Sequence, residues 1–124
     1  MTAAAERGQQ AEKLAEALLR REKMRVVARN VRFPVGELDL ITWDGRTLCF
    51  VEVRSRASAD FGSASESVTW RKQRRVIRAA QWYLKRQRVI PESIRFDVVA
   101  VDWSAAKPGI ELIRSAFVVD PSGW

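Results

Sequence analysis

Three carboxylates and one arginine are the side chains whose types and spacing could support chemistry here: Glu37, Asp39, Glu52 and Arg54. They lie in two neighbouring stretches rich in apolar and β-favoured residues, 36–43 and 46–54. Because strand side chains alternate between two faces, all four would emerge on one face of a hairpin. Three carboxylates on one face repel one another unless positive charge lies among them. The pattern therefore indicates a site for a divalent cation.

The dipeptide Asp-Gly at residues 44–45 separates the two stretches and is a strong signal for a tight hairpin turn. As a two-residue loop, it would place Asp39 opposite Phe50 and Glu37 opposite Glu52. Asp39 and Glu52 would then be diagonal neighbours, roughly 7–8 Å apart. A three-residue loop would turn one strand over and separate Asp39 from Glu52.

A charged hairpin face is usually only the solvent-facing side of a sheet. Here the carboxylate face also carries large apolar residues, and the opposite face is apolar throughout. The first set is Ile41, Leu48 and Phe50, and the second is Leu38, Leu40, Cys49, Val51 and Val53. The strands are therefore predicted to be buried on both sides. Since buried acids without partners cost free energy, a functional role for these acids is favoured.

The composition limits both the size of the fold and its chemistry. A chain of 124 residues with 47% hydrophobic content fits one folded domain with a modest core. Histidine is absent, which excludes His-based triads, His general bases and zinc sites with His ligands. Hydrolytic chemistry would have to rest on carboxylates, Lys or Arg, and a hard metal ion with oxygen ligands.

The net charge of +7 and the pI near 10.5 favour a polyanionic partner. No apolar run approaches the roughly 18 residues of a membrane span, and the N-terminus lacks a signal-peptide core. No membrane association and a cytoplasmic location are therefore expected. The single cysteine, Cys49, is predicted to pack in a strand as a reduced, small apolar residue.

Periodicity and turn signals predict the order helix, strand, hairpin, helix, strand and short strand. The helices are expected over 4–22 and 70–88, and the strands over 24–33, 36–43, 46–54, 94–103 and 110–113. A long loop is expected over 55–69, with Thr69 as the cap of the second helix. This order predicts an α/β domain with a mixed sheet flanked by helices.

The second predicted helix is crowded with cations and has no acidic residue: Arg71, Lys72, Arg74, Arg75, Arg78, Lys85, Arg86 and Arg88. Basic helix faces are commonly only solvated. This one, however, lacks the acids at i, i+4 that would support a lone helix. A surface that contacts a phosphate backbone is the better interpretation.

Seven short motifs resemble the YraN-type family of small bacterial proteins, and through it the restriction-endonuclease-like superfamily that includes archaeal Holliday junction resolvases. The resemblance covers nearly the whole chain. Its motifs are Gly8-Gln9-Gln10-Ala11-Glu12, Arg29-Asn30, Gly36-Glu37-Leu38-Asp39-Leu40-Ile41, Phe50-Val51-Glu52-Val53-Arg54-Ser55-Arg56, Phe61-Gly62, Arg71-Lys72-Gln73 and Arg95-Phe96-Asp97-Val98-Val99.

The resemblance implies the superfamily core, αβββαβ, which agrees with the order of elements predicted above. It also implies Asp39 and Glu52 as metal ligands and Glu37 as a further acid lining the site. Glu12 flanks an apolar helical stripe and would otherwise be read as a solvated edge residue. The resemblance makes it the additional acid that resolvase-like members carry on their first helix.

One position departs from the superfamily pattern, which usually has Lys two residues after the second-strand acid. This chain has Arg54 there. A buried Lys can lose its proton near a metal, whereas Arg stays charged. Arg54 could orient water or stabilise transition-state charge, but it could not act as a general base.

These observations lead to the hypothesis of a Mg²⁺- or Mn²⁺-dependent nuclease acting on branched or otherwise structured DNA. Asp39, Glu52 and the Val53 carbonyl would hold the ion, and Glu12 and Glu37 would complete the pocket. The basic helix and Arg56 would bind phosphates. A non-catalytic nucleic-acid-binding module and a basic protein-interaction adaptor remain alternatives. The oligomeric state is left open, a homodimer included.

Overall fold

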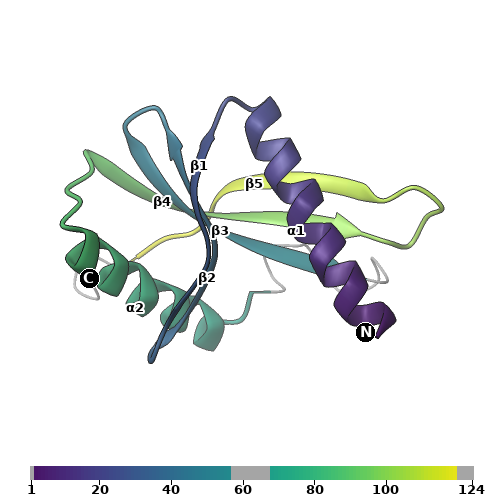
Figure 1. Ribbon diagram of the computed structural model, residues 1–124, viewed down its shortest axis with the longest axis horizontal. Helices are drawn as coiled ribbons and strands as arrows, with labels where there is room; N and C mark the ends of the chain where they lie inside the picture. The colour runs from purple at the N-terminus through teal and green to yellow at the C-terminus, as the bar shows by residue number, and fades with distance from the viewer. Residues whose placement is uncertain (1, 57–67, 120–124) are drawn as a thin grey trace.

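The computed structural model describes residues 2–56 and 68–119. Two helices and five strands follow in the predicted order (Figure 1). They are α1 (Ala3–Arg21), β1 (Arg25–Phe33), β2 (Gly36–Asp44), β3 (Thr47–Arg56), α2 (Trp70–Gln87), β4 (Ser93–Asp102) and β5 (Gly109–Phe117). The last strand extends to Phe117, four residues beyond the predicted end at Ile113. Most of the predicted loop over 55–69, including Phe61-Gly62, lies outside the described residues.

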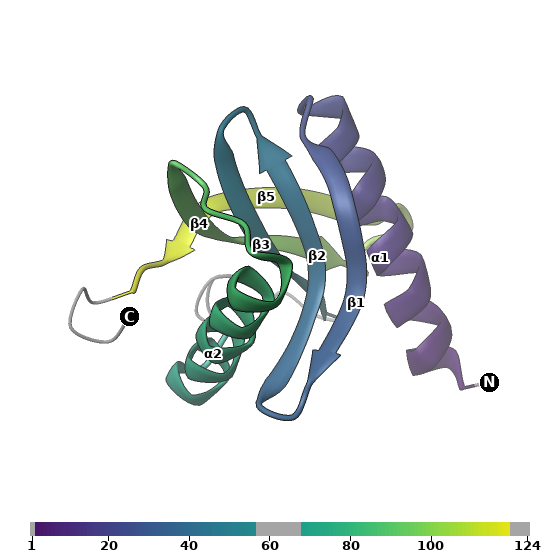
Figure 2. The same cartoon turned by 60° about the vertical axis from the view of Figure 1, so that its left-hand side comes forward.

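The five strands form one mixed sheet in the order β1-β2-β3-β4-β5. Only β3 and β4 pair in parallel, and α2 provides the crossover between them. The helices α1 and α2 lie on opposite sides of this sheet (Figure 2). The predicted α/β class, with a mixed sheet flanked by helices and an αβββαβ core, is confirmed. Neither helix in the described part of the chain is long and apolar enough to cross a membrane.

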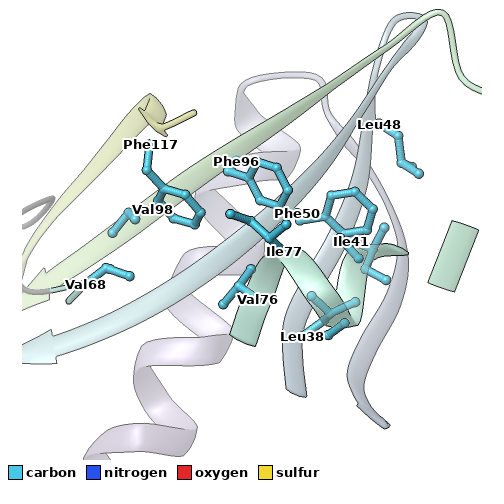
Figure 3. Packing of buried hydrophobic residues seen from close by; sticks show 12 residues of the cluster. Leu38, Ile41, Leu48, Phe50, Val68, Val76, Ile77, Phe96, Val98 and Phe117 are labelled. Carbon is cyan, nitrogen blue, oxygen red and sulfur yellow. The ribbon is translucent and has the colours of Figure 1, made fainter. Parts of the chain in front are cut away.

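Each face of the sheet has its own apolar core. On the α2 side, Phe50, Phe96 and Phe117 stack in a row, with ring centroids 5.5 and 5.1 Å apart (Figure 3). On the α1 side, helix residues such as Leu19 pack against Cys49 and other strand residues. The prediction of strands buried on both sides is therefore confirmed. Burial also raises the pKa of the Cys49 thiol to about 11, as expected for a thiol that packs as an apolar side chain.

The predicted hairpin register was wrong by two residues. Ile41 lies opposite Phe50, and Asp44 is itself paired, with Thr47. The loop is therefore residues 45–46, with Gly45 as its first central residue at φ +60°. Glycine is favoured at this position because a residue with a side chain would be strained at this φ. A shift of two residues does not by itself move a side chain to the other face of the sheet, so it does not separate the acids.

The regular alternation of β2 breaks at Asp39. Leu40 packs in the core under α1, whereas Leu38 packs with Ile41 in the core under α2. The prediction that Leu38 and Leu40 share a face was therefore wrong. The break coincides with two local features: pairing between β2 and β3 ends at Leu40 and Val51, and Asn30 of β1, which lies between the partners of Leu40 and Leu38, has φ +50°.

Candidate active site

Asp39 lies where β2 and β3 separate. Leu40 and Val51 form the last pair between β2 and β3 on the side away from the hairpin turn. Asp39 precedes Leu40 in β2, and Glu52 follows Val51 in β3. Asp39 Oδ2 accepts a hydrogen bond of 2.9 Å from the backbone N–H of Val53. This bond joins the carboxylate to β3. Asp39 is therefore held next to Glu52 at the point where the pairing between β2 and β3 ends.

Glu52 is only 1% exposed and lies on the side of the sheet that α2 covers. Its Oε1 atom is 3.5 Å from the Nζ atom of Lys72, in the first turn of α2. Thr69 caps this turn as predicted, because its side chain accepts a 3.2 Å hydrogen bond from the Lys72 N–H. The cap thus fixes the turn that places one ammonium group beside the buried acid.

The two carboxylates are electrostatically strained. Burial, and then the charge of Asp39, raises the pKa of Glu52 to about 8, against the opposing effect of Lys72. Burial also raises the pKa of Asp39, with smaller contributions in the same direction from Glu12 and Glu37. The Val53 N–H and Lys72 act against this increase. The site therefore holds more negative charge than its own cation and hydrogen bonds offset.

Glu12 joins this site from the opposite side of the sheet. It lines a cavity of about 380 Å³ together with Asp39, Val53, Ser55 and the α1 residues Ala5, Gly8, Gln9 and Ala11. A second cavity, of about 460 Å³, lies on the other side of Glu12 beside Glu16 and Arg29. The half-buried Glu12 thus lies at the edge of a cavity that Asp39 also lines, and its charge raises the pKa of Asp39.

Glu37 lies at the margin of the site. Its half-exposed carboxylate is 3.5 Å from the Nε atom of Arg32 on β1. It lines a separate cavity with Arg75 of α2. Nearby, a Cβ on Gly36 would lie 2.8 Å from the Arg75 carbonyl oxygen, so only glycine allows β2 to begin this close to α2. The effect of Glu37 on Asp39 is therefore electrostatic and does not pass through a shared hydrogen bond.

The basic residues predicted to act here occupy different positions. Arg54 is half-buried and follows Glu52 by two residues on β3. Arg56 lies opposite Asp102 in the parallel ladder. On α2, Arg71, Arg75 and Arg78 are exposed, Arg74 is half-buried and Lys72 turns to Glu52. Apart from Lys72, these α2 cations are available on the outer side of the helix.

Asp39 and Glu52 are better suited to bind a small hard cation that keeps some of its waters than to form a metal site closed by protein ligands. In the described part of the chain, no three His, Cys, Asp or Glu side chains come together as a group that could hold an ion. Mg²⁺ usually needs fewer protein ligands, because one or two carboxylates with waters and substrate phosphates complete its coordination. Two neighbouring carboxylates that repel each other, one of which, Asp39, lines a cavity, meet that requirement.

Lys72 is the site residue whose position the sequence reasoning missed, since it was grouped with the phosphate-binding cations. A signal was present. Lys72 precedes the buried Val76 by four residues, so both lie on one face of α2. A cation on the buried edge of an otherwise apolar stripe indicates an acidic partner in the sheet.

Comparison with known proteins identifies the family of this chain. A protein of the UPF0102 family from Nitrosospira multiformis is 47% identical over 116 residues, covering 94% of this chain and 96% of the relative. One from Desulfosudis oleivorans is 46% identical over 110 residues, covering 89% and 88% respectively. The family model described as "Uncharacterised protein family UPF0102" matches residues 11–101. The chain therefore belongs to the UPF0102, or YraN-like, family.

Proposed function

We propose that this protein is a divalent-metal-dependent nuclease of the restriction-endonuclease-like superfamily that acts on branched or otherwise structured DNA. One observation carries the proposal: two acids, Asp39 and Glu52, are held together where the pairing between β2 and β3 ends, although burial and mutual repulsion oppose it. Buried groups with strongly shifted pKa values concentrate at functional sites. A helix with exposed cations begins beside this pair, as a phosphate-binding enzyme requires.

Asp39, Glu52 and the Val53 carbonyl would hold Mg²⁺ or Mn²⁺ in this proposal, and Glu12 would line the adjoining cavity. When bound, the ion would polarise a phosphoryl oxygen and acidify a water. Arg54 would stabilise negative charge on the phosphate, since a guanidinium keeps its charge at any working pH. Arg56, Arg71, Arg74, Arg75 and Arg78 would bind neighbouring phosphates.

Lys72 changes the interpretation of Arg54. The superfamily usually supplies one ammonium group from β3, and this chain supplies one from α2 instead, 3.5 Å from Glu52. Arg54 therefore need not be the group that balances the charge of Glu52. We propose that Lys72 positions the Glu52 carboxylate and that Arg54 faces the substrate.

Labelled duplex, single-stranded and four-way-junction DNA, incubated with and without Mn²⁺, test the proposal. The wild type should nick at least one of them only when Mn²⁺ is present. Asp39→Asn should abolish nicking, because a neutral amide binds the ion weakly. Glu111→Gln, which removes an exposed acid of β5, is the matched control and should nick normally. Nicking by Asp39→Asn at the wild-type rate would exclude this site.

Arg54 gives the same assay a second use. Arg54→Lys should keep or raise the nicking rate, since Lys is the superfamily's usual residue, and Arg54→Ala should abolish it while Mn²⁺ binding persists. An active wild type whose rate is unaffected by Arg54→Ala would exclude every role proposed for this residue.

The second candidate is a nucleic-acid-binding module without turnover. It is favoured by Arg54 at the usual Lys position and by the partners that both acids already have in the chain itself. Binding without cleavage of any substrate would support it. In either case, replacing the exposed Arg71, Arg75 and Arg78 with Ala should flatten the dependence of log affinity on log salt by roughly 0.9 for each lost phosphate contact. A protein adaptor would show no such salt dependence with DNA.

A further inference from the structure

Trp70 is an aromatic side chain in an unusual position. It is the first residue of α2 and is 73% exposed, more than any other aromatic residue in the described ranges. The guanidinium carbon of Arg74, one turn further along, lies 5.7 Å from the centre of its ring. Because an indole ring gains much free energy from burial, a surface that leaves one in water is a candidate binding surface.

Trp82, on the same helix, shows what a structural tryptophan looks like here. Its ring packs against Phe33 of β1 with centroids 5.8 Å apart, and the residue is 37% exposed. Twelve residues separate it from Trp70, which places the two side chains roughly 120° apart around the helix. Trp82 helps to attach α2 to the sheet, whereas Trp70 lies at the other edge of the exposed face.

The surroundings of Trp70 identify the chemistry of its partner. Arg71 is exposed beside it, Arg74 lies over its ring, and the first turn of α2 has no acidic residue. Lys72, in the same turn, reaches Glu52. Trp70 and Lys72 share this turn but lie roughly 160° apart around the helix, so the exposed cations Arg71 and Arg75 lie on the outer face between the ring and the side of the acid pair. This combination matches a strand whose bases stack on the ring while its phosphates meet the cations.

We propose that Trp70 and Arg74 form a stacking platform for an unpaired nucleotide, so that the strand presented to the acid pair is single-stranded at this point. Bases within a duplex are already stacked and paired, and their faces are not available to a side chain. The substrate class is therefore a strand with unpaired nucleotides, such as a flap, a gap or a junction arm. This inference rests on the proposed function and specifies its substrate.

Binding without cleavage provides the test. In EDTA, fluorescence anisotropy would compare a labelled 12-nucleotide single strand, the same strand with abasic sites, and a duplex of equal length. The wild type should bind the intact strand more tightly than the abasic one. Trp70→Ala should weaken binding to the intact strand by about 5- to 150-fold, the loss of one stacked base, and remove the preference over the abasic strand. Trp70→Phe should restore most of the affinity.

Trp82→Ala is the matched control, because it removes the same side chain from the same helix but at the edge that packs on Phe33. It should leave the preference for intact bases unchanged. Equal losses on single strand and duplex for Trp70→Ala, or a wild type indifferent to abasic sites, would overturn the platform while nucleic-acid binding and the nuclease proposal stand. A wild type that binds none of the three probes would overturn the platform together with the binding step of the proposed function.

Discussion

Two groups of buried acids lie in the same sheet and differ in how their negative charge is balanced. Asp97 of β4 is fully buried, and its carboxylate accepts hydrogen bonds from Arg95 Nε, at 2.8 Å, from Arg95 Nη2 and from the backbone N–H of Ser115. Arg95 also bonds Asp44 at the hairpin turn. Asp39 and Glu52 instead face each other and share one ammonium group, Lys72.

Asp97 therefore stabilises the fold through its hydrogen bonds, whereas Asp39 and Glu52 are held close together by the fold against their repulsion. The carboxylate of Asp97 has a donor for each oxygen, and two of its donor residues, Arg95 and Ser115, line a cavity of about 500 Å³. Asp39 lines a cavity of about 380 Å³ itself, and the charges of Glu12 and Glu37 raise its pKa. Burial and a nearby cavity are therefore common to both groups. The feature that distinguishes Asp39 and Glu52 from Asp97 is repulsion between acids that their own hydrogen bonds and cation do not offset.

The largest effect expected from this comparison is on folding stability. Asp97→Ala should lower the free energy of unfolding by at most about 3–5 kcal/mol, because it removes the acceptor of the partly buried Arg95 guanidinium and of the Ser115 N–H, while Arg95 keeps its bond to Asp44. Asp39→Ala should change it by only about 1 kcal/mol, because the lost hydrogen bond is offset by relief of repulsion. Urea unfolding of both variants measures the two losses of stability. Equal losses would contradict the difference between Asp97 and Asp39.

The next effect is a dependence of stability on pH. Burial and the charge of Asp39 raise the pKa of Glu52 from its ordinary 4.5 to about 8, so between these values the native state keeps a proton that the unfolded chain has released. The free energy of unfolding must therefore fall as the pH rises through this window, by at most about 1.4 kcal/mol per pH unit for one proton. Glu52→Gln removes the effect. Urea unfolding at pH 5, 6, 7 and 8 in EDTA should give a steeper decline for the wild type, and parallel curves would contradict the shift.

The sequence predicted the fold and the proximity of Asp39 and Glu52, because both depend on local patterns. The two strands of one hairpin carry these acids, and a two-residue error in register could not separate them. The break in alternation at Leu38 and the reach of Lys72 into the acid pair were not predicted. Both depend on where α2 packs against the sheet, and a single chain's periodicity contains little information about packing between distant elements.

A divalent ion should sharpen the same contrast through binding. Mn²⁺ at 100 times its dissociation constant should stabilise the wild type by about 2.7 kcal/mol, provided that it binds only the native state. Asp39→Ala and Glu52→Ala should show no such gain, since each removes one of the two carboxylates. Thermal melts with and without Mn²⁺ measure the shift, with Glu111→Gln as the control for loss of an ordinary surface charge. Equal shifts in all four proteins would remove the acid pair from consideration as the ion site.

The smallest effect concerns the cavity that Asp39 lines together with α1. Gly8 lines that cavity from α1, and a Cβ built on it would meet no atom within 4 Å. Helix propensity alone therefore predicts that Gly8→Ala raises the free energy of unfolding by about 0.5–1 kcal/mol. Gly36→Ala is the matched control, since its Cβ would lie 2.8 Å from a backbone oxygen and should destabilise the fold. If the cavity admits the substrate, the added methyl group in Gly8→Ala should also lower kcat/KM for nicking, although the protein is more stable. A more stable Gly8→Ala that nicks at the wild-type kcat/KM would mean that the substrate reaches Asp39 by another path.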